Sequence, residues 1–142
     1  MNILLINPAI TQSEVYAKYS AGAPCLPPLG LCYLAAVLIE KGYDVRIIDC
    51  VAEKVSNSEL KKEIERFRPD VVGMTSTTIS YTAAKAVLKA IKEVEPNITT
   101  VLGGAHISAL PTATMREKQT RNYSRCSPCH PKEQSTSALW KK

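Results

Sequence analysis

The sequence predicts one doubly wound α/β domain, in which a parallel sheet carries a layer of helices on each face. Short apolar segments of four or five residues alternate with longer segments of helical periodicity over residues 1–118. Continuous apolar strands of this kind are typical of parallel sheets that are buried on both faces. The length of 142 residues and the 45% hydrophobic content suit a single buried core.

Four strands are expected, each an apolar run that ends at a turn residue. Right-handed crossovers between them give a flavodoxin-like strand order of 2-1-3-4 in a three-layer arrangement. The usual fifth strand is expected to be missing, because polar residues dominate from about Gln119 onward. The fourth strand would then be an open sheet edge through which the chain could self-associate. The four strands are Ile3–Ile6, Val45–Asp49, Asp70–Met74 and Ile98–Leu102.

Three longer helices are expected between these strands. Leu31–Ile39 is almost wholly apolar and follows Pro27–Pro28, so it is expected to be a well-buried helix that starts near these prolines. Ser56 and Glu59 fit a capping box for the second helix, and Ser80 is expected to cap the third. The expected inner faces are Leu60, Ile64 and Phe67 in the second helix, and Ala84, Val87, Leu88, Ile91 and Val94 in the third.

The net charge of +5 is confined to the end of the chain. Residues 1–111 carry 11 Lys+Arg and 11 Asp+Glu, whereas residues 112–142 carry 7 and 2. A neutral body with a basic tail lacks the clustered basic face of a nucleic-acid-binding fold, so no nucleic-acid partner is expected. The longest apolar run, Leu31–Ile39, is far below the roughly 20 residues of a membrane span. A soluble, cytoplasmic domain is therefore expected.

The residues that follow each strand are the candidate ligand-binding residues, because doubly wound sheets bind ligands beyond the carboxyl ends of their strands. Most of them are small or uncharged. Glycines and short hydroxyl side chains suit a large ligand that approaches the backbone closely. The four segments are Asn7–Ala9, Asp49–Cys50, Thr75–Thr78 and Gly103–His106.

Several common functions of this fold are excluded by missing residues. The first strand is followed neither by a glycine-rich dinucleotide turn nor by the Gly-Lys-Ser/Thr of a phosphate loop. A phosphorylated receiver domain would need an acidic pair and an aspartate where Asn7 and Thr75 stand. A small hydrolase or transferase would need a nucleophile and a base, which cannot be identified, so no catalytic residue is expected in this chain.

Four motifs at the strand ends resemble, in the right order, the N-terminal cobalamin-binding domain of cobalamin-dependent radical SAM enzymes. The resemblance covers roughly residues 1–115. The motifs are Ile6-Asn7-Pro8, Pro27-Pro28-Leu29-Gly30 with Leu34-Ala35, Pro69-Asp70-Val71-Val72-Gly73 with Thr75-Ser76-Thr77, and Leu102-Gly103-Gly104-Ala105-His106.

This resemblance implies that the nucleotide tail of cobalamin binds in a slot at the strand ends, with Pro8 and Ala9 nearby and Ala105 and His106 beside the double glycine. The broader superfamily often places a cobalt-ligating histidine in Asp-x-His-x-x-Gly after the first strand, where residues 7–12 here are Asn-Pro-Ala-Ile-Thr-Gln. Cobalamin is therefore implied to bind without a protein histidine, and no metal ligand is expected. The implied slot residues are Thr75, Ser76, Thr77, Gly103 and Gly104.

The resembled enzymes hold an iron–sulfur cluster on Cys-x3-Cys-x2-Cys, together with S-adenosylmethionine, in a following barrel domain. No such cysteine spacing occurs in the 142 residues. The resemblance thus implies an accessory domain, of a methyltransferase-like enzyme, that is separated from its radical SAM barrel and binds cobalamin without turnover. A non-catalytic interaction module that has lost its ligand is the alternative.

Each motif also has a purely structural interpretation. Gly103–Gly104 suits a tight strand-to-helix turn, and the Thr75–Thr78 run suits a helix-capping loop. His106, beside a glycine turn, fits a pocket-wall or surface residue better than a cobalt ligand.

The end of the chain is expected to lie outside the domain. After a short helix over about Pro111–Lys118, the composition becomes polar and basic. Cys126-Ser127-Pro128-Cys129-His130 matches a haem-attachment pattern, but it has no export signal or helical core and offers too few ligands for a zinc site. We interpret residues 1–118 as a cobalamin-binding domain truncated at its C-terminal end, and residues 119–142 as a non-globular tail produced by a frameshift near residues 115–120.

Overall fold

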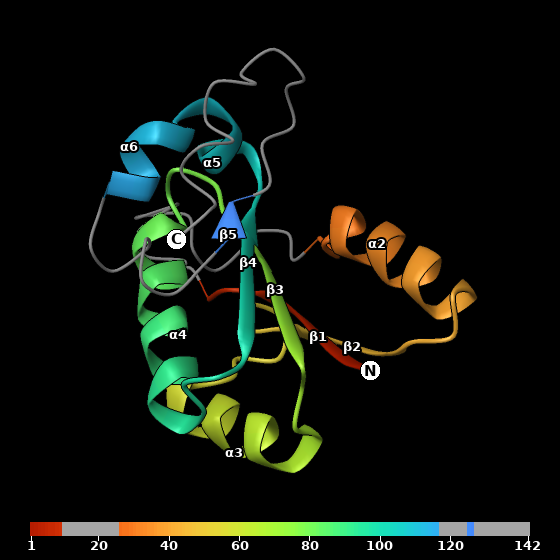
Figure 1. The fold of residues 1–142 in the computed structure, drawn as a ribbon. Helices are drawn as coiled ribbons and strands as arrows, with labels where there is room; N and C mark the ends of the chain where they lie inside the picture. The colour runs from red at the N-terminus through yellow and green to blue at the C-terminus, as the bar shows by residue number, and fades with distance from the viewer. Residues whose placement is uncertain (10–25, 117–124, 127–142) are drawn as a thin grey trace.

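The computed structural model describes residues 1–9, 26–116 and 125–126, and it contains the predicted alternation of strands and helices (Figure 1). The expected strands and the three longer helices are all present, with bounds that differ by one to three residues. The elements are β1 (Asn2–Asn7), α2 (Leu29–Glu40), β2 (Asp44–Asp49), α3 (Asn57–Phe67), β3 (Val71–Thr75), α4 (Tyr81–Val94), β4 (Thr99–Gly103), α5 (Ala105–Ala109), α6 (Pro111–Arg116) and β5 (Arg125–Cys126).

The sheet is parallel throughout, and its strand order is β2-β1-β3-β4-β5. The predicted order 2-1-3-4 of the four full strands is confirmed. The fifth position needs a correction, because Arg125–Cys126 pairs with Val101 and Leu102 of β4. This two-residue pairing comes from the segment that we expected to contribute no strand. It requires only two backbone neighbours and no apolar run, which is why hydrophobic patterning does not reveal it.

The helices lie on opposite faces of the sheet because the crossovers run in opposite directions from β1. α3 and α4 cover one face, and α2 covers the other (Figure 1). The larger core lies under α3 and α4 and includes Leu4, Ile6, Val72, Met74 and Leu102 from the strands. The core under α2 is smaller, and its buried members are Ile3, Leu5, Leu31 and Ala35.

α2 differs from the prediction in its burial. The sequence favoured a well-buried helix, but Leu31 and Ala35 are its only fully buried residues. Tyr33, Leu34 and Val37 are more than half exposed. An apolar composition on all sides shows that a helix is suited to burial, but the number of packing partners in the fold decides how much of it is buried.

α3 begins as the sequence predicts, whereas α4 does not. Ser56 accepts a hydrogen bond from the Glu59 backbone N–H at 3.3 Å, and the Glu59 side chain accepts one from the Ser56 backbone N–H at 2.9 Å. Ser80 makes no capping hydrogen bond with its side chain. Instead, the Thr77 hydroxyl accepts a hydrogen bond from the Ser80 backbone N–H at 3.3 Å, so the loop before α4 supplies the contact.

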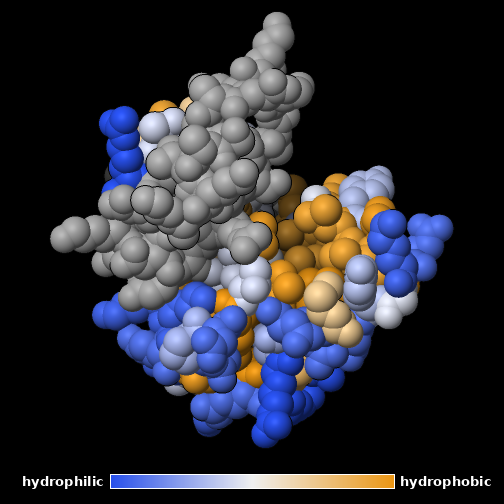
Figure 2. Space-filling model, in the orientation of Figure 1, coloured by the Kyte–Doolittle hydropathy of each residue, from blue (hydrophilic) through white to orange (hydrophobic). Residues whose placement is uncertain are grey.

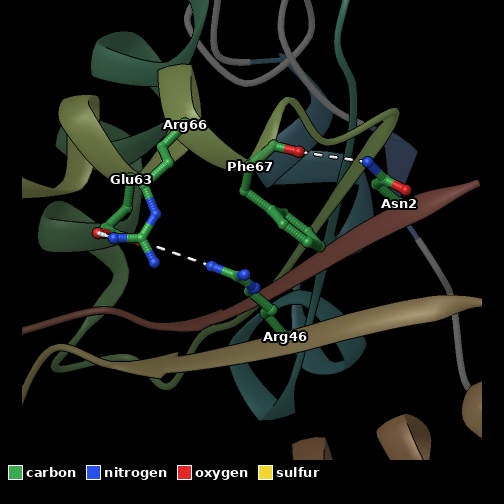
Figure 3. A network of polar contacts seen from close by, with 5 residues as sticks. All are labelled: Asn2, Arg46, Glu63, Arg66 and Phe67. Atoms are coloured by element: carbon green, nitrogen blue, oxygen red, sulfur yellow. Dashed lines mark hydrogen bonds and ion pairs between the residues drawn. The ribbon is translucent and has the colours of Figure 1, made fainter.

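β2 is the outer strand on the other side of the sheet, and charged side chains line it. The Arg46 guanidinium lies 4.5 Å above the Phe67 ring and 3.8 Å from the Glu63 carboxylate, which also pairs with Arg66 (Figure 3). Asn2, in the neighbouring strand, donates to the Phe67 carbonyl at 3.2 Å. Charges on an outer strand discourage pairing with another chain.

A cavity of about 500 Å³ lies between β2 and α3, away from the carboxyl ends of β3 and β4.

Candidate ligand-binding edge

β1, β3 and β4 end at the same level, which brings the candidate segments together. Ile6 pairs with Met74, and Thr75 pairs with Gly103. The residues that follow these pairs therefore form one edge of the sheet. Sequence reasoning predicted this edge, because parallel strands of similar length place all their carboxyl ends on one side.

Ser76 joins the segments after β3 and β4. Its backbone N–H donates to the Gly103 carbonyl at 2.9 Å, and its carbonyl accepts from the His106 N–H at 3.1 Å. The Ser76 side chain is fully buried, and its hydroxyl donates to the Thr77 carbonyl at 3.2 Å. Ser76 is therefore a structural bridge between the two loops, and its hydroxyl is not exposed at the edge.

The two glycines of Gly103–Gly104 have different surroundings. A Cβ at Gly104 would lie 2.5 Å from the Ser76 carbonyl oxygen and 2.6 Å from its nitrogen, and the backbone there has φ 98° and ψ 177°. This conformation is essentially restricted to glycine. A Cβ at Gly103 would have its nearest neighbour, the Met74 carbonyl oxygen, at 3.9 Å. Gly104 is thus required by the turn, whereas the described residues would accommodate a side chain at Gly103 without a clash.

The hydroxyl run has both buried and exposed members. Thr75 is half-buried, whereas Thr77 and Thr78 are exposed. The Thr77 backbone N–H donates to the Ser80 hydroxyl at 2.8 Å. The Thr77 side chain therefore serves the turn before α4, in agreement with the structural interpretation of this run, while it remains accessible from solvent.

His106 forms one wall of the edge and is held by side chains from α4 and its preceding loop. Its Nδ1 lies 3.2 Å from the Thr78 hydroxyl, and its ring stacks on Tyr81 at 4.3 Å with an interplanar angle of 26°. The Lys85 ammonium lies 4.7 Å from the Tyr81 ring centroid on that helix. His106 is half-buried, which fits the predicted wall position. Ala105, beside it, is exposed.

The segment after β1 places its candidates at different depths. Pro8 is fully buried, so its ring supports the strand end and presents no exposed surface. Ala9 is exposed and occupies the stretch where the superfamily's histidine is expected. The Asn7 side chain donates to the Asp49 carboxylate at 3.0 Å, which fixes the end of β1 to the end of β2.

The end of β2 is a closed polar turn. The Asp49 carboxylate also accepts from the Val51 and Ala52 backbone N–H groups at 3.1 and 3.3 Å. Burial and the negative charges of Asp49 and Glu53 raise the pKa of the Cys50 thiol to about 11. Cys50 is therefore a neutral, buried thiol at physiological pH.

In the described residues, no group of three or more histidine, cysteine, aspartate or glutamate side chains is placed to hold a metal.

The sequence reasoning missed two features that position His106 at the edge. Tyr81 supports the His106 ring, and α5 provides the helical turn on which His106 stands. Tyr81 follows Ser80 at the start of a helix, where its spacing marks only a buried position. α5 has five residues and no capping side chain, so it is too short to produce a periodic pattern. Cys129 and His130 of the haem-like pattern lie outside the described residues.

The fold is that of a doubly wound α/β domain, and the edge formed by its strand ends has few large side chains. The sequence profile of the family described as "B12 binding domain" matches residues 21–123, which is most of the chain. The chain belongs to this family. Within the described residues, no helix has both the length and the hydrophobicity to span a bilayer.

Three relatives show the kinds of protein in which similar sequences occur. The chain is 41% identical over 117 residues to an uncharacterized methyltransferase of Pyrococcus horikoshii, covering 82% of this chain and 24% of the relative. It is 40% identical over 81 residues to an anaerobic magnesium-protoporphyrin IX monomethyl ester cyclase of Rubrivivax gelatinosus, covering 56% and 15%. It is 33% identical over 132 residues to a cytidylyl-2-hydroxyethylphosphonate methyltransferase of Streptomyces wedmorensis, covering 80% and 24%. The chain thus spans a quarter or less of these relatives.

Proposed function

We propose that this chain binds cobalamin at the edge formed by the β3–α4 and β4–α5 loops, as the accessory domain of a radical SAM enzyme of the methyltransferase kind. The observation that carries the proposal is that the described residues leave room for a side chain at Gly103, in a chain of the B12-binding family. Ala9, Thr77, Thr78 and Ala105, which follow the ends of β1, β3 and β4, are exposed and have small side chains. A corrinoid side arm needs such an edge, because it must pass close to the backbone.

Within the proposed site, the residues have separate roles. Gly103 admits the ligand, and the Thr77 and Thr78 hydroxyls offer hydrogen bonds at its border. Gly104 and Ser76 hold the two loops in position through the Ser76 backbone hydrogen bonds. His106 forms a wall that is fixed by Tyr81 and Thr78. Pro8 supports the edge from below and contributes no contact of its own.

The proposal includes cobalamin that is not ligated by histidine. Ala9 stands in the segment after β1 where a ligating histidine would be expected, and its side chain has no donor atom. His106 lies in α5, after β4, and its ring is stacked on Tyr81, so it does not stand in the segment after β1. Electron paramagnetic resonance of the cob(II)alamin complex, made with ¹⁵N-histidine-labelled protein, should give the same hyperfine pattern as unlabelled protein. A labelled-histidine coupling to cobalt would contradict this part of the proposal.

The catalytic chemistry is proposed to reside outside this chain. When bound, cobalamin can carry a methyl group, and the iron–sulfur cluster and S-adenosylmethionine would be held by a barrel domain that these 142 residues lack. Two of the relatives are named as methyltransferases, and all three relatives are at least four times longer than the matched part. The isolated chain is therefore expected to bind cobalamin and to show no turnover.

A titration with hydroxocobalamin tests the binding proposal. The expected result is a shifted visible spectrum that remains with the protein through a desalting column. Gly103→Leu should abolish retention, because its side chain fills the free space above β4. Gly30→Leu is the matched control, because Gly30 lies in α2 and a Cβ there would have no neighbour within 4 Å.

The alternative, an interaction module that has lost its ligand, predicts a different result. The folded wild type would then fail to retain hydroxocobalamin, and Gly103→Leu would change nothing. Circular dichroism and thermal unfolding of all three proteins establish that the variants are folded. Retention by Gly103→Leu equal to that of wild type would reject the proposed location of the site even if the chain binds cobalamin.

A further inference from the structure

The side chain of His106 joins the two loops of the proposed binding edge. His106 lies in the first turn of α5, and its ring reaches the β3–α4 loop, where Nδ1 lies 3.2 Å from the Thr78 hydroxyl. The ring is stacked on Tyr81, which is buried at the start of α4, with the two centroids 4.3 Å apart. Contacts from two separate segments therefore fix the position and the orientation of the ring.

The second ring nitrogen of His106, Nε2, has no hydrogen-bond partner among the described residues, and the side chain is only half-buried. A neutral imidazole carries its proton on one nitrogen and accepts a hydrogen bond at the other. When the Thr78 hydroxyl donates to Nδ1, the ring proton lies on Nε2. His106 then presents an oriented N–H donor, and the ligand atom that this donor fits is an oxygen acceptor.

The segments around His106 carry positive charge and no carboxylate. Residues 71–92 and 96–116, which contain β3, β4 and the loops after them, include no aspartate or glutamate. The Lys85 ammonium lies 4.7 Å from the Tyr81 ring centroid. Because Tyr81 stacks on His106, this ammonium lies within ~10 Å of the His106 ring, about one Debye length in 0.1 M salt. A negatively charged oxygen is therefore favoured over a neutral one.

The neighbouring elements do not reverse this charge. α2 begins at the same end of the sheet, because a crossover helix runs antiparallel to its strands, and it has no charged residue before Glu40. Figure 2 shows a hydrophobic surface at the position of α2 in Figure 1. Among the four longer strands only β2 ends in a carboxylate, Asp49, which is held by Asn7 and by two backbone N–H groups. β1 separates β2 from β3.

We propose that the His106 Nε2–H donates a hydrogen bond to the phosphodiester in the nucleotide tail of cobalamin. This inference rests on the proposed function and gives His106 a recognition role in addition to its position as a wall. Thr78 and Tyr81 are positioning residues that orient the ring, and Lys85 contributes positive charge. The phosphodiester is the negatively charged oxygen group of the tail, so the chain is expected to select corrinoids that carry this phosphate.

Three corrinoids test the selection for phosphate. Cobinamide lacks the phosphate and the nucleoside, cobinamide phosphate restores the phosphate alone, and hydroxocobalamin has the whole tail. Their binding to the full 142-residue chain is followed by visible spectroscopy. Wild type is expected to bind cobinamide phosphate about 10-fold or more tightly than cobinamide, as for a hydrogen bond to a charged group. Equal affinities for these two compounds would overturn the proposal.

Two substitutions separate hydrogen bonding by His106 from packing. His106→Phe retains a ring that stacks on Tyr81 but removes the N–H donor, so the preference for cobinamide phosphate should be lost. His106→Gln removes the ring but retains an N–H donor at a similar reach, so most of the preference should remain. A wall that acts only by packing predicts the opposite order, and this result would overturn the proposal. Circular dichroism and thermal unfolding establish that both variants are folded.

The positioning role of Tyr81 is tested in two backgrounds. Tyr81→Leu should reduce the preference for cobinamide phosphate when His106 is present and should cause no further reduction in His106→Phe. Equal reductions in both backgrounds would contradict a role that acts through His106.

The contribution of charge is tested on α4. Lys85→Gln should lower the preference for cobinamide phosphate, and more so at low salt. Lys89→Gln is the matched control, because Lys89 lies one turn further along α4 and its ammonium is 4.0 Å from the Glu93 carboxylate. Equal effects of the two substitutions would contradict a local role of Lys85.

The same measurements distinguish failure of this inference from failure of the proposed function. A folded wild type that binds none of the three corrinoids rejects the proposed function and the inference with it. Binding of hydroxocobalamin that depends neither on the phosphate nor on His106 rejects the inference alone.

Discussion

At the scale of single residues, the edge of the sheet depends on two adjacent glycines with different functions. Gly104 has a backbone conformation that other residues rarely adopt, and it lies against the Ser76 peptide. Gly103 ends β4, and a Cβ there would come no closer than 3.9 Å to a described neighbour. Any substitution at Gly104 therefore acts on folding, so ligand-binding experiments should target Gly103.

Gly104→Ala is expected to destabilise the domain by about 3 kcal/mol or more, because it combines about 1–3 kcal/mol of backbone strain with a clash against Ser76. Gly103→Ala should cost less than about 1 kcal/mol, because its Cβ meets no close neighbour. Urea unfolding followed by circular dichroism measures both. Equal losses of stability in the two variants would contradict the assignment of separate functions.

Thr100→Val is expected to stabilise the domain by about 1 kcal/mol. The Thr100 hydroxyl is buried in β4 and has no hydrogen-bond partner among the described residues. Valine has nearly the same shape and removes the unsatisfied polar atom. The midpoint of urea unfolding should rise with an unchanged slope. A lower midpoint would mean that the hydroxyl has a partner that stabilises it.

The Cys50 thiol is expected to be unreactive in the native protein. Its pKa is raised from 9.0 to about 11, mainly by burial and then by the charges of Asp49 and Glu53, so the reactive thiolate is scarce at pH 8. Wild type and Cys50→Ala should give equal thiol counts with Ellman's reagent under native conditions and differ by one thiol in guanidinium.

The same raised pKa of Cys50 makes stability depend on pH. A raised thiol pKa gives stability that is fully present below the unfolded pKa and is lost as the pH rises through the folded pKa. Wild type should therefore lose stability relative to Cys50→Ala between about pH 9 and 11. If the difference in unfolding free energy between the two proteins stayed constant over this pH range, the thiol would not titrate as described.

At the scale of elements, α3 is defined by its local sequence to a greater extent than α2. Its capping box, its apolar stripe of Leu60, Ile64 and Phe67, and its end before Pro69 all agree with the predicted helix. α2 has no capping side chain, and its amphipathic contrast is weak because almost all its residues are apolar. Local sequence thus predicted where α2 lies but not which of its sides is buried.

Ser56→Ala is expected to cost about 1 kcal/mol of stability by removing the N-terminal cap of α3. Ser56→Thr, which retains a hydroxyl that can both accept from the Glu59 N–H and donate to its carboxylate, should preserve most of the stability. The Ser56 hydrogen bonds lower the pKa of Glu59, so this contribution is present at neutral pH and is lost as the pH falls through the folded pKa. Equal effects of the two substitutions in urea unfolding would contradict a capping role.

Much of the element pattern could be predicted because apolar runs and turn residues agree along the chain. Each predicted strand is present within one residue of its expected bounds. The expectation that failed at α4 has a physical cause. Ser80 is a good capping residue type, but the hydroxyl of Thr77 reaches the Ser80 backbone N–H, and the Ser80 side chain turns back to Thr77. Neighbouring hydroxyls compete for such positions, and sequence alone does not decide between them.

At the scale of the whole molecule, topology determines which residues share the candidate edge. The order β2-β1-β3-β4 places the ends of β1, β3 and β4 side by side, so residues separated by up to about 100 positions meet there. The sequence predicted this meeting from general rules for doubly wound sheets. It could not predict that Ser76 and Pro8 are buried within the edge, because burial depends on the packing of the loops against each other.

The chain shortened to residues 1–118 is expected to fold, because the described core lies within residues 3–107 and β5 contributes only two paired residues. Circular dichroism should show the same secondary structure, and the melting temperature should fall by only a few degrees. The β4 edge would then be fully unpaired, so aggregation on heating should increase. Loss of the cooperative unfolding transition would contradict the domain boundary.

The two backbone hydrogen bonds of Ser76 affect the expected kinetics of the proposed cobalamin binding. Because both hydrogen bonds tie Ser76 of the β3–α4 loop to Gly103 and His106, on either side of Gly104, neither loop can swing open alone without breaking them. The proposed binding edge is therefore preorganised before cobalamin binds, and little conformational entropy is lost when the complex forms. Association should then be a single step. Its observed rate constant should rise linearly with cobalamin concentration, without the plateau that a slow opening motion would cause.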